Sequence, residues 1–169
     1  MCYNGEGGAM YNILFVCYGN ICRSPMAEMI FKDLIYKNNK RYMFSCASRA
    51  TSICEIGNDI YPQAKEKLQE KGVTCEVHRA MQIKKEDYQL YDYIIVMEEQ
   101  NKKEVQKIMG DDYLNKVHLL LEYTDNVKGI DDPWYTGDFE KAYEEIAKGC
   151  EGLYKYLLQK GMKDNGAEI

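Results

Sequence analysis

The segment at residues 17–25, CYGNICRSP, lies between two hydrophobic patterns of different period. Residues 13–16 before it form an apolar run, which predicts a buried parallel strand. After it, apolar residues recur at helical spacing from Met26 to Ile35. Ser24 suits the cap of that helix and Pro25 its first position. The segment therefore predicts a strand, a short loop and a helix that Ser24 caps.

A loop of this kind directs its backbone N–H groups and the helix N-terminus at one spot, where they bind a phosphate-like anion. Cys17, at the base of the loop, should ionise to a thiolate because the same field stabilises S⁻. Arg23 offers the fork of donors that a phosphoryl group needs. These groups together predict phosphoryl transfer through a cysteinyl-phosphate. The predicted phosphate-binding residues are Tyr18, Gly19, Asn20, Ile21, Cys22, Arg23 and Ser24.

The composition fits one cytoplasmic domain. The chain has 169 residues and a net charge of -5, so it has no general attraction for nucleic acid or an anionic membrane. No apolar run approaches the ~20 residues of a membrane span. Seven scattered cysteines without a Cys-x2-Cys pair favour reduced thiols over disulfides or a metal site. We expect a flexible leader at residues 1–10, a domain at 11–161 and a flexible tail at 162–169.

Strand and helix patterns alternate along the chain. This alternation predicts an α/β fold, a doubly wound sandwich with a central four-stranded parallel sheet and helices on both faces. Ligands bind such sheets at the carboxyl ends of the strands, where the loop after the first strand lies. Strands are expected at residues 13–16, 42–47, 93–97 and 117–121, with residues 48–58 as loop. Helices are expected at residues 25–37, 62–71, 84–90, 98–109 and 138–160.

The leaving group of a phosphate ester needs a proton, and a water must later be activated. The long loop at residues 123–137 offers Asp132 for both tasks. Pro133 biases Asp132 toward an extended geometry, so we choose Asp132 over Asp131 as the general acid. Trp134 and Tyr135 would wall the site and stack on an aryl group. A plain surface turn is the alternative interpretation of this Asp-Pro pair.

The Cys-x5-Arg-Ser pattern after a strand resembles the signature loop of cysteine-dependent phosphatases. The fuller string at residues 16–25 resembles that of the low-molecular-weight protein tyrosine phosphatases, and Asp132 matches the Asp-Pro-aromatic acid of that family. The resemblance implies a flavodoxin-like fold and hydrolysis of phosphotyrosine without metal or cofactor. Cys17 would be the nucleophile, Arg23 would bind the phosphate, and Asp132 would be the general acid and base.

The resemblance also implies supporting roles. Ser48, after the second strand, and His78 would hold Asn20 of the loop. Cys22 would form a protective disulfide with Cys17 under oxidation, although simple packing below the loop is an equal alternative. The sequence departs from the family at Tyr18 and Cys54, both expected at the pocket wall, and at Trp134, which replaces a tyrosine.

Three other functions remain open on this fold. Protein-arginine phosphatases resemble this loop but carry threonine where Ile21 stands here. Arsenate reductases need two further, closely spaced cysteines, which the sequence lacks between Cys75 and Cys150. A binding module for phosphotyrosine without turnover is the third alternative. We expect phosphotyrosine-containing proteins as substrates, inhibition by phosphate, sulfate and vanadate, and a monomer capable of weak self-association.

Overall fold

The computed structural model describes residues 10–166, whose centre is one four-stranded sheet. All neighbouring strands pair in parallel, in the order β2-β1-β3-β4. Their bounds are Tyr11–Cys17 for β1, Phe44–Ala50 for β2, Tyr93–Val96 for β3 and Val117–Leu119 for β4. The chain goes from β1 to one neighbour, β2, and later returns to the other, β3. The carboxyl end of β1 therefore lies at the switch point where ligands bind such sheets.

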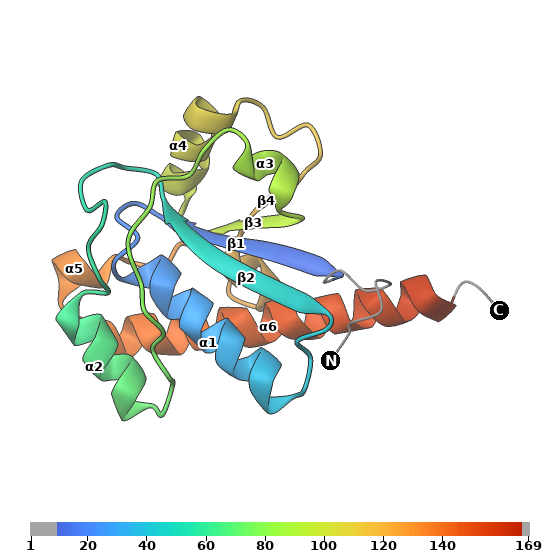
Figure 1. Cartoon of the computed structure of the whole chain (residues 1–169), viewed down its shortest axis with the longest axis horizontal. Coiled ribbons are helices and arrows are strands. Elements are labelled where there is room, and N and C mark those ends of the chain that lie inside the picture. The colour runs from blue at the N-terminus through green and yellow to red at the C-terminus, as the bar shows by residue number, and fades with distance from the viewer. Residues whose placement is uncertain (1–9, 167–169) are drawn as a thin grey trace.

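Helices cover both faces of the sheet (Figure 1). One face packs against α1, α2 and α6, which span Arg23–Lys37, Pro62–Glu70 and Phe139–Gly166. The other face packs against α3 and α4, which span Asp87–Leu90 and Glu99–Met109. A 3-10 helix at Leu120–Tyr123 follows β4, and a single turn, α5 at Pro133–Thr136, precedes α6. The predicted three-layer α/β sandwich is confirmed.

The apolar run in β1 is continuous because both sides of the strand are buried. Ile13 and Phe15 face the core beneath α1 and α6, whereas Leu14 and Val16 face the core beneath α3 and α4. All four side chains are fully buried. The strand therefore holds its carboxyl end, Cys17, at a fixed point between the two helical layers.

Several predicted bounds were wrong. The second strand is Phe44–Ala50, so Ser48 belongs to a strand and not to a loop. The first helix begins at Arg23 with Cys22 as its cap residue, and no side chain caps it. The fourth strand ends at Leu119, and the 3-10 helix takes up the residues expected to extend it.

The last helix was expected to end near residue 160 but continues to Gly166. It thus includes part of the segment predicted as a tail, while residues 167–169 and residues 1–9 of the predicted leader lie outside the described residues. Gly152 within this helix allows close packing, because a Cβ there would lie 2.0 Å from the carbonyl oxygen of Tyr123. Helix α6 can therefore approach the 3-10 helix closely only with glycine at this position.

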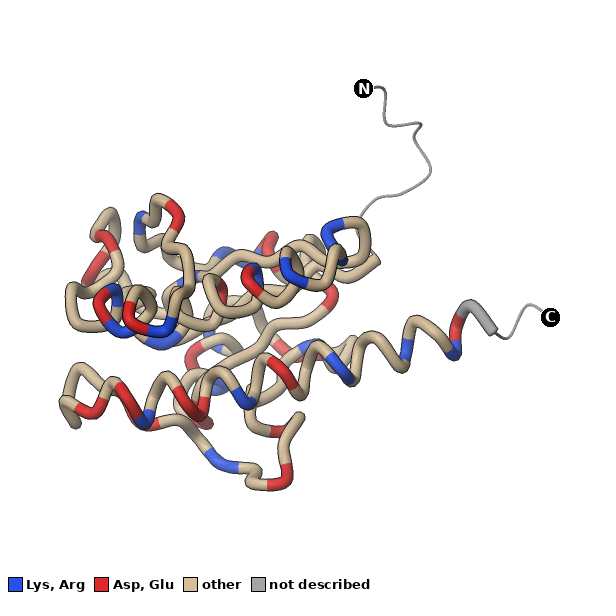
Figure 2. Tube along the Cα trace, turned by 90° about the horizontal axis from the view of Figure 1, so that it is seen from below, with Lys and Arg blue, Asp and Glu red and all other residues tan. Residues whose placement is uncertain are grey.

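Acidic and basic residues alternate along the chain, including along α6 (Figure 2). No helix within the described part of the chain is long and apolar enough to cross a membrane. The same residues contain no group of three His, Cys, Asp or Glu side chains that could hold a metal ion.

Candidate active site

The loop between β1 and α1 surrounds the sulfur of Cys17 with hydrogen-bond donors. The backbone N–H groups of Asn20 and Ser24 donate to Cys17 Sγ over 3.3 and 3.4 Å. The Ser24 hydroxyl lies 3.1 Å from the same sulfur. Donors that converge on one atom stabilise a negative charge there. The loop therefore places two backbone N–H donors and one hydroxyl group around the sulfur at the end of β1.

Asn20 holds the loop in shape. Its φ of 58° lies in the left-handed region, which asparagine tolerates better than most residues. Its Nδ2 donates to Ser24 Oγ and Ser48 Oγ over 2.8 and 2.9 Å, and its Oδ1 accepts from Met81 N over 3.1 Å. His78 Nε2 donates to the Asn20 carbonyl over 2.7 Å. The structure thus brings Ser48 and His78 into contact with Asn20.

The Ser24 side chain does not cap the helix, contrary to the prediction. The residue lies inside the first turn of α1, and its hydroxyl is engaged by Asn20 Nδ2 and approaches Cys17 Sγ. The same hydroxyl donates to the Arg49 carbonyl over 3.4 Å. The contact with the Cys17 sulfur is present in place of a cap.

Arg23 is the first residue of α1 and is buried, with only 1% of its surface exposed. Its Nη1 donates to Glu98 and to the Ile130 carbonyl, and its Nη2 donates to Asp132 Oδ2 over 3.3 Å. Burial lowers the pKa of Arg23, but Cys17, Asp132 and Glu98 outweigh it and raise the pKa above its ordinary value. The guanidinium therefore stays charged.

The Nε of Arg23 is also buried and has no hydrogen-bond partner among the described residues. An unpartnered donor of this kind is costly, and a charged donor more so. A phosphoryl oxygen in the pocket would satisfy it. This orphaned donor is the clearest sign that the pocket is built for an anion.

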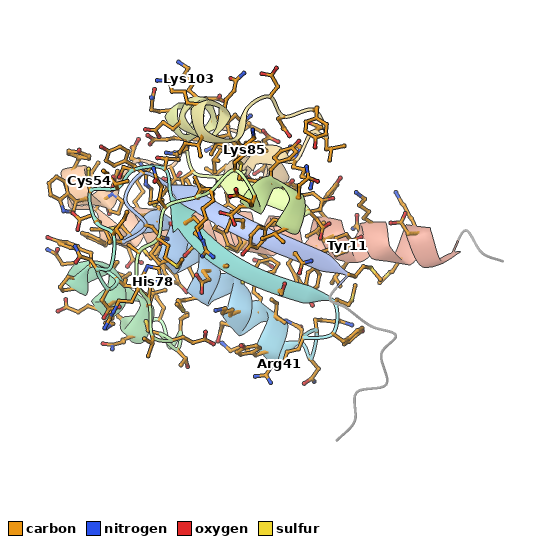
Figure 3. All side chains as sticks on the ribbon, turned by 45° about the horizontal axis from the view of Figure 1, so that its top comes forward. Tyr11, Arg41, Cys54, His78, Lys85 and Lys103 are labelled. Atoms are coloured by element: carbon orange, nitrogen blue, oxygen red, sulfur yellow. The ribbon has the colours of Figure 1, made fainter. Side chains whose placement is uncertain are left out.

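The pocket above Cys17 has a volume of about 240 Å³. On one side the Tyr18 hydroxyl and the Cys54 sulfur are 3.6 Å apart. On the other side the rings of Trp134 and Tyr135 meet edge to face with centroids 4.9 Å apart. Figure 3 shows Cys54 at the left of the molecule, on the side away from Tyr11. The predicted wall residues all line the pocket, together with Cys17, Gly19, Ile21, Cys22, Arg23, Glu55 and Asp132.

Asp132 and Asp131 differ sharply in position. Asp132 is the cap residue of α5: its Oδ1 accepts from Trp134 N over 3.0 Å, while its Oδ2 accepts from Arg23. Its side chain is 20% exposed and lines the pocket. Asp131 is 67% exposed and pairs with Lys141 at 3.4 Å. The geometry therefore gives Asp132, and not its neighbour, access to a leaving group above Cys17.

Cys22 is buried below the loop and also lines the pocket. Burial is the main cause that raises the pKa of its thiol, and the neighbouring Cys17 raises it further. The thiol is therefore protonated at neutral pH, and every cysteine of the described chain is free.

Two carboxylates of this site, Glu98 and Glu55, were not predicted from the sequence. Glu98 follows Met97 after the end of β3 and pairs with Arg23, which fixes the guanidinium. Glu55 lines the pocket beside Gly19. Glu98 caps α4, which follows a strand that pairs with β1, so its place depends on a strand order that no local pattern encodes. Glu55 lies in a loop, where no periodic pattern of apolar residues indicates the position of a side chain.

Fold and site together define the class of this protein, a phosphoric monoester hydrolase of α/β fold. A sequence model described as "Low molecular weight phosphotyrosine protein phosphatase" matches residues 12–163. The chain belongs to this family and is a protein tyrosine phosphatase.

Individual phosphatases of this family are similar to the chain over most of its length. The low molecular weight protein-tyrosine-phosphatase YfkJ of Bacillus subtilis is 36% identical over 146 residues, which cover 85% of this chain and 94% of the relative. The low molecular weight phosphotyrosine protein phosphatase of Homo sapiens is 35% identical over 150 residues, 86% of this chain and 94% of the relative. The crystal structure of YfkJ superposes with a TM-score of 0.87 and 34% identity, over 90% of this chain and 98% of that one.

Proposed function

We propose that Cys17, Arg23 and Asp132 carry out the hydrolysis of phosphotyrosine in two steps. In the first step the Cys17 sulfur attacks phosphorus and forms an S–P bond. The bond from phosphorus to the tyrosyl oxygen breaks, and a protonated Asp132 gives its proton to the leaving phenolate. Arg23 and the loop N–H groups bind the phosphoryl oxygens during this transfer.

In the second step water attacks the cysteinyl-phosphate. Asp132, now ionised, takes a proton from that water, the S–P bond breaks and inorganic phosphate leaves. The Ser24 hydroxyl, 3.1 Å from the sulfur, would donate to the departing thiolate. Asp132 is bonded to Arg23 in the structure, so an incoming phosphate dianion must compete for Arg23 and release the carboxyl group.

The observation that carries this proposal is the convergence of donors on two places in one pocket. Two backbone N–H donors and the Ser24 hydroxyl surround the Cys17 sulfur, and a buried guanidinium keeps one N–H without a partner among the described residues. The aromatic walls support an aryl phosphate over the shorter phosphoserine. Small aryl phosphates should react as well.

We test the nucleophile with Cys17→Ser, assayed with p-nitrophenyl phosphate and with vanadate as the binding probe. The variant should lose turnover and keep vanadate affinity, because the donors of the cradle remain. Cys75→Ser, which alters a cysteine outside the pocket, is the matched control and should keep full turnover. Steady hydrolysis by Cys17→Ser would reject the proposal, whereas loss of both properties together with loss of the native circular dichroism spectrum would identify misfolding.

The finer features of the function belong to the same proposal. We assign the activity to a single domain at residues 11–161 and place it in the cytoplasm, where the free cysteines stay reduced. Phosphotyrosine-containing proteins are the substrates, and phosphate, sulfate and vanadate compete with them. The enzyme works as a monomer without cofactor. Under oxidation, Cys22 would bond to Cys17 and protect it from further oxidation.

A further inference from the structure

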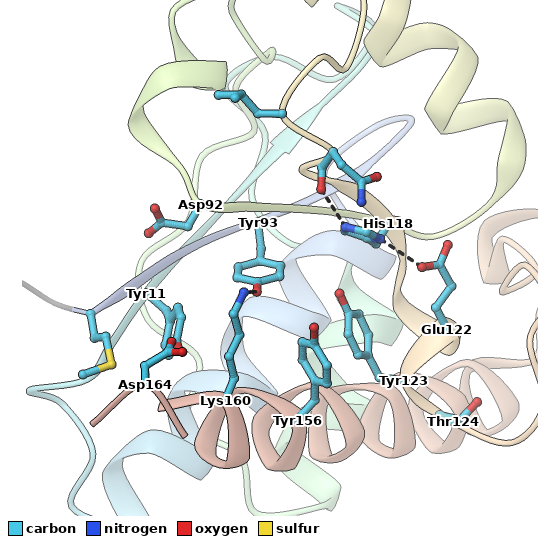
Figure 4. A pocket seen from close by; sticks show the side chains of 13 residues that line it. Tyr11, Asp92, Tyr93, His118, Glu122, Tyr123, Thr124, Tyr156, Lys160 and Asp164 are labelled. Carbon is cyan, nitrogen blue, oxygen red and sulfur yellow. Dashed lines mark hydrogen bonds and ion pairs between the residues drawn. The ribbon is translucent and has the colours of Figure 1, made fainter. Parts of the chain in front are cut away.

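A second and larger pocket lies at the amino ends of β1 and β3. Its volume is about 1000 Å³, and it opens between the sheet and the last turns of α6 (Figure 4). Tyr11, which lines it, and Cys54 of the active site lie at opposite ends of the molecule (Figure 3). The two pockets have no lining residue in common. The phosphatase reaction therefore gives no reason for this pocket.

Aromatic rings form a continuous wall of this pocket. The ring centroids of Tyr11 and Tyr93 are 6.1 Å apart, and those of Tyr93 and His118 are 6.3 Å apart. The wall continues from His118 to Tyr123 at 6.3 Å and from Tyr123 to Tyr156 at 5.2 Å. Such a surface favours a planar aromatic ligand, which can stack on or meet the rings edge to face.

Lys160 projects from α6 into the same pocket. Its ammonium donates to the Tyr93 hydroxyl over 2.8 Å and lies 5.4 Å from the centre of that ring. No carboxylate of the described residues lies within 4.0 Å of it. The hydrogen bond with Tyr93 is the main cause that raises the pKa of Lys160, so the group is charged. An ammonium whose one partner is a neutral phenol retains donors for an anion.

Two of the three acidic residues that line the pocket, Asp92 and Glu122, already accept hydrogen bonds. Glu122 accepts from His118 at 3.0 Å and from Lys102 at 3.3 Å, and Asp92 accepts from a backbone N–H at 2.7 Å. Asp164 lies at the far end, beside Tyr11 (Figure 4). Tyr11 is 6% exposed, and its buried hydroxyl has no partner among the described residues. Lys160 and Tyr11 thus both line this cavity, Lys160 with a charged group.

We propose that this pocket is a second ligand site, which binds a planar aromatic monocarboxylate. The carboxylate binds the Lys160 ammonium and the Tyr93 hydroxyl, and the aromatic ring packs against Tyr123 and Tyr156. The site is separate from the phosphate cradle and needs none of the catalytic residues.

The test is isothermal titration calorimetry, which measures the affinity of the full chain for 4-hydroxyphenylacetate. Saturating vanadate is present to fill the active site. The neutral 4-hydroxyphenylacetamide has the same shape and should bind much more weakly. Lys160→Gln should weaken binding of the carboxylate about tenfold, the worth of one charge-assisted hydrogen bond. Lys155→Gln, an exposed change on the same helix outside the pocket, should leave binding unchanged.

Asp164→Asn supplies a change in the opposite direction. It removes a negative charge from the pocket and should tighten binding of the carboxylate severalfold. Hydrolysis of p-nitrophenyl phosphate reports that each variant is folded, since none of Lys155, Lys160 and Asp164 lines the active site. Equal affinity for acid and amide, unchanged affinity in Lys160→Gln, or binding that vanadate abolishes would each overturn the proposal.

Discussion

Replacement of Asn20 by alanine tests how the phosphate cradle is held. The side chain is fully buried and makes three hydrogen bonds, to Ser24, Ser48 and Met81. Loss of three neutral hydrogen bonds costs together about 3 kcal/mol. Alanine at a φ of 58° adds about 1 kcal/mol, because it lacks the tolerance of asparagine for this conformation. We expect the free energy of unfolding to fall by about 4 kcal/mol, a large part of a typical ~5–15 kcal/mol.

Asn39→Ala is the matched control. Asn39 has a φ of 54° but is exposed, and its side chain makes no hydrogen bond within the described structure. This variant should lose only about 1 kcal/mol, the backbone share of the effect. Urea unfolding followed by circular dichroism measures both values.

The same change at Asn20 should damage catalysis. A loop displaced by about 1 Å from its productive position loses about 100-fold in kcat/KM. Asn39→Ala should keep the wild-type kcat/KM for p-nitrophenyl phosphate. If the two variants lost equal stability, or if Asn20→Ala kept its kcat/KM, the argument that side-chain bonds hold the cradle would be refuted.

Three further predictions concern the acid, the second cysteine and a surface carboxylate. Asp132→Ala should slow the steady-state cleavage of aryl phosphates by ~10²–10⁴, and less for substrates with good leaving groups. A larger loss of rate in Asp131→Ala would reverse the assignment. Mild peroxide should inactivate the wild type reversibly, and recovery by thiol should be lost in Cys22→Ser; unchanged recovery would exclude the disulfide. Hydrogen bonds from Lys67 and then from a second lysine lower the pKa of Glu140 from 4.5 to about 2. Since the folded pKa is the lower one, this contribution to stability is present above about pH 4.5 and lost toward pH 2. Urea unfolding at a series of pH values should therefore find Glu140→Gln less stable than the wild type above about pH 4.5. Near pH 2 the two should be equally stable, and a difference that persisted there would contradict this.

The sequence predicted most of what local patterns encode. Periodicity separated strands from helices. The nine residues from Cys17 to Pro25 predicted the phosphate-binding loop, because each of them serves the turn, the start of the helix or the binding of the anion. Asp132 could be chosen over Asp131 from the proline that follows it. All these signals lie within a few residues of the side chains they predict.

Features that depend on tertiary neighbours could not be predicted in this way. The edge strand Phe44–Ala50 contains Ser45, Ser48 and Arg49, so its polar end was interpreted as loop. The pair of Arg23 and Glu98 forms because β3 lies beside β1. The pocket at the amino ends of the strands collects side chains from Tyr11 to Asp164, whose closeness no motif records.

The central claim is that Cys17 carries the phosphoryl group during turnover. Rapid quench of Asp132→Ala with p-nitrophenyl phosphate, followed by peptide mass spectrometry, tests it directly. This variant still forms the intermediate from a good leaving group but activates water poorly, so the phosphoenzyme should accumulate. We expect one phosphoryl group on the peptide that contains Cys17. Phosphate on another residue, or continued turnover with no phosphoenzyme at any quench time, would contradict the account.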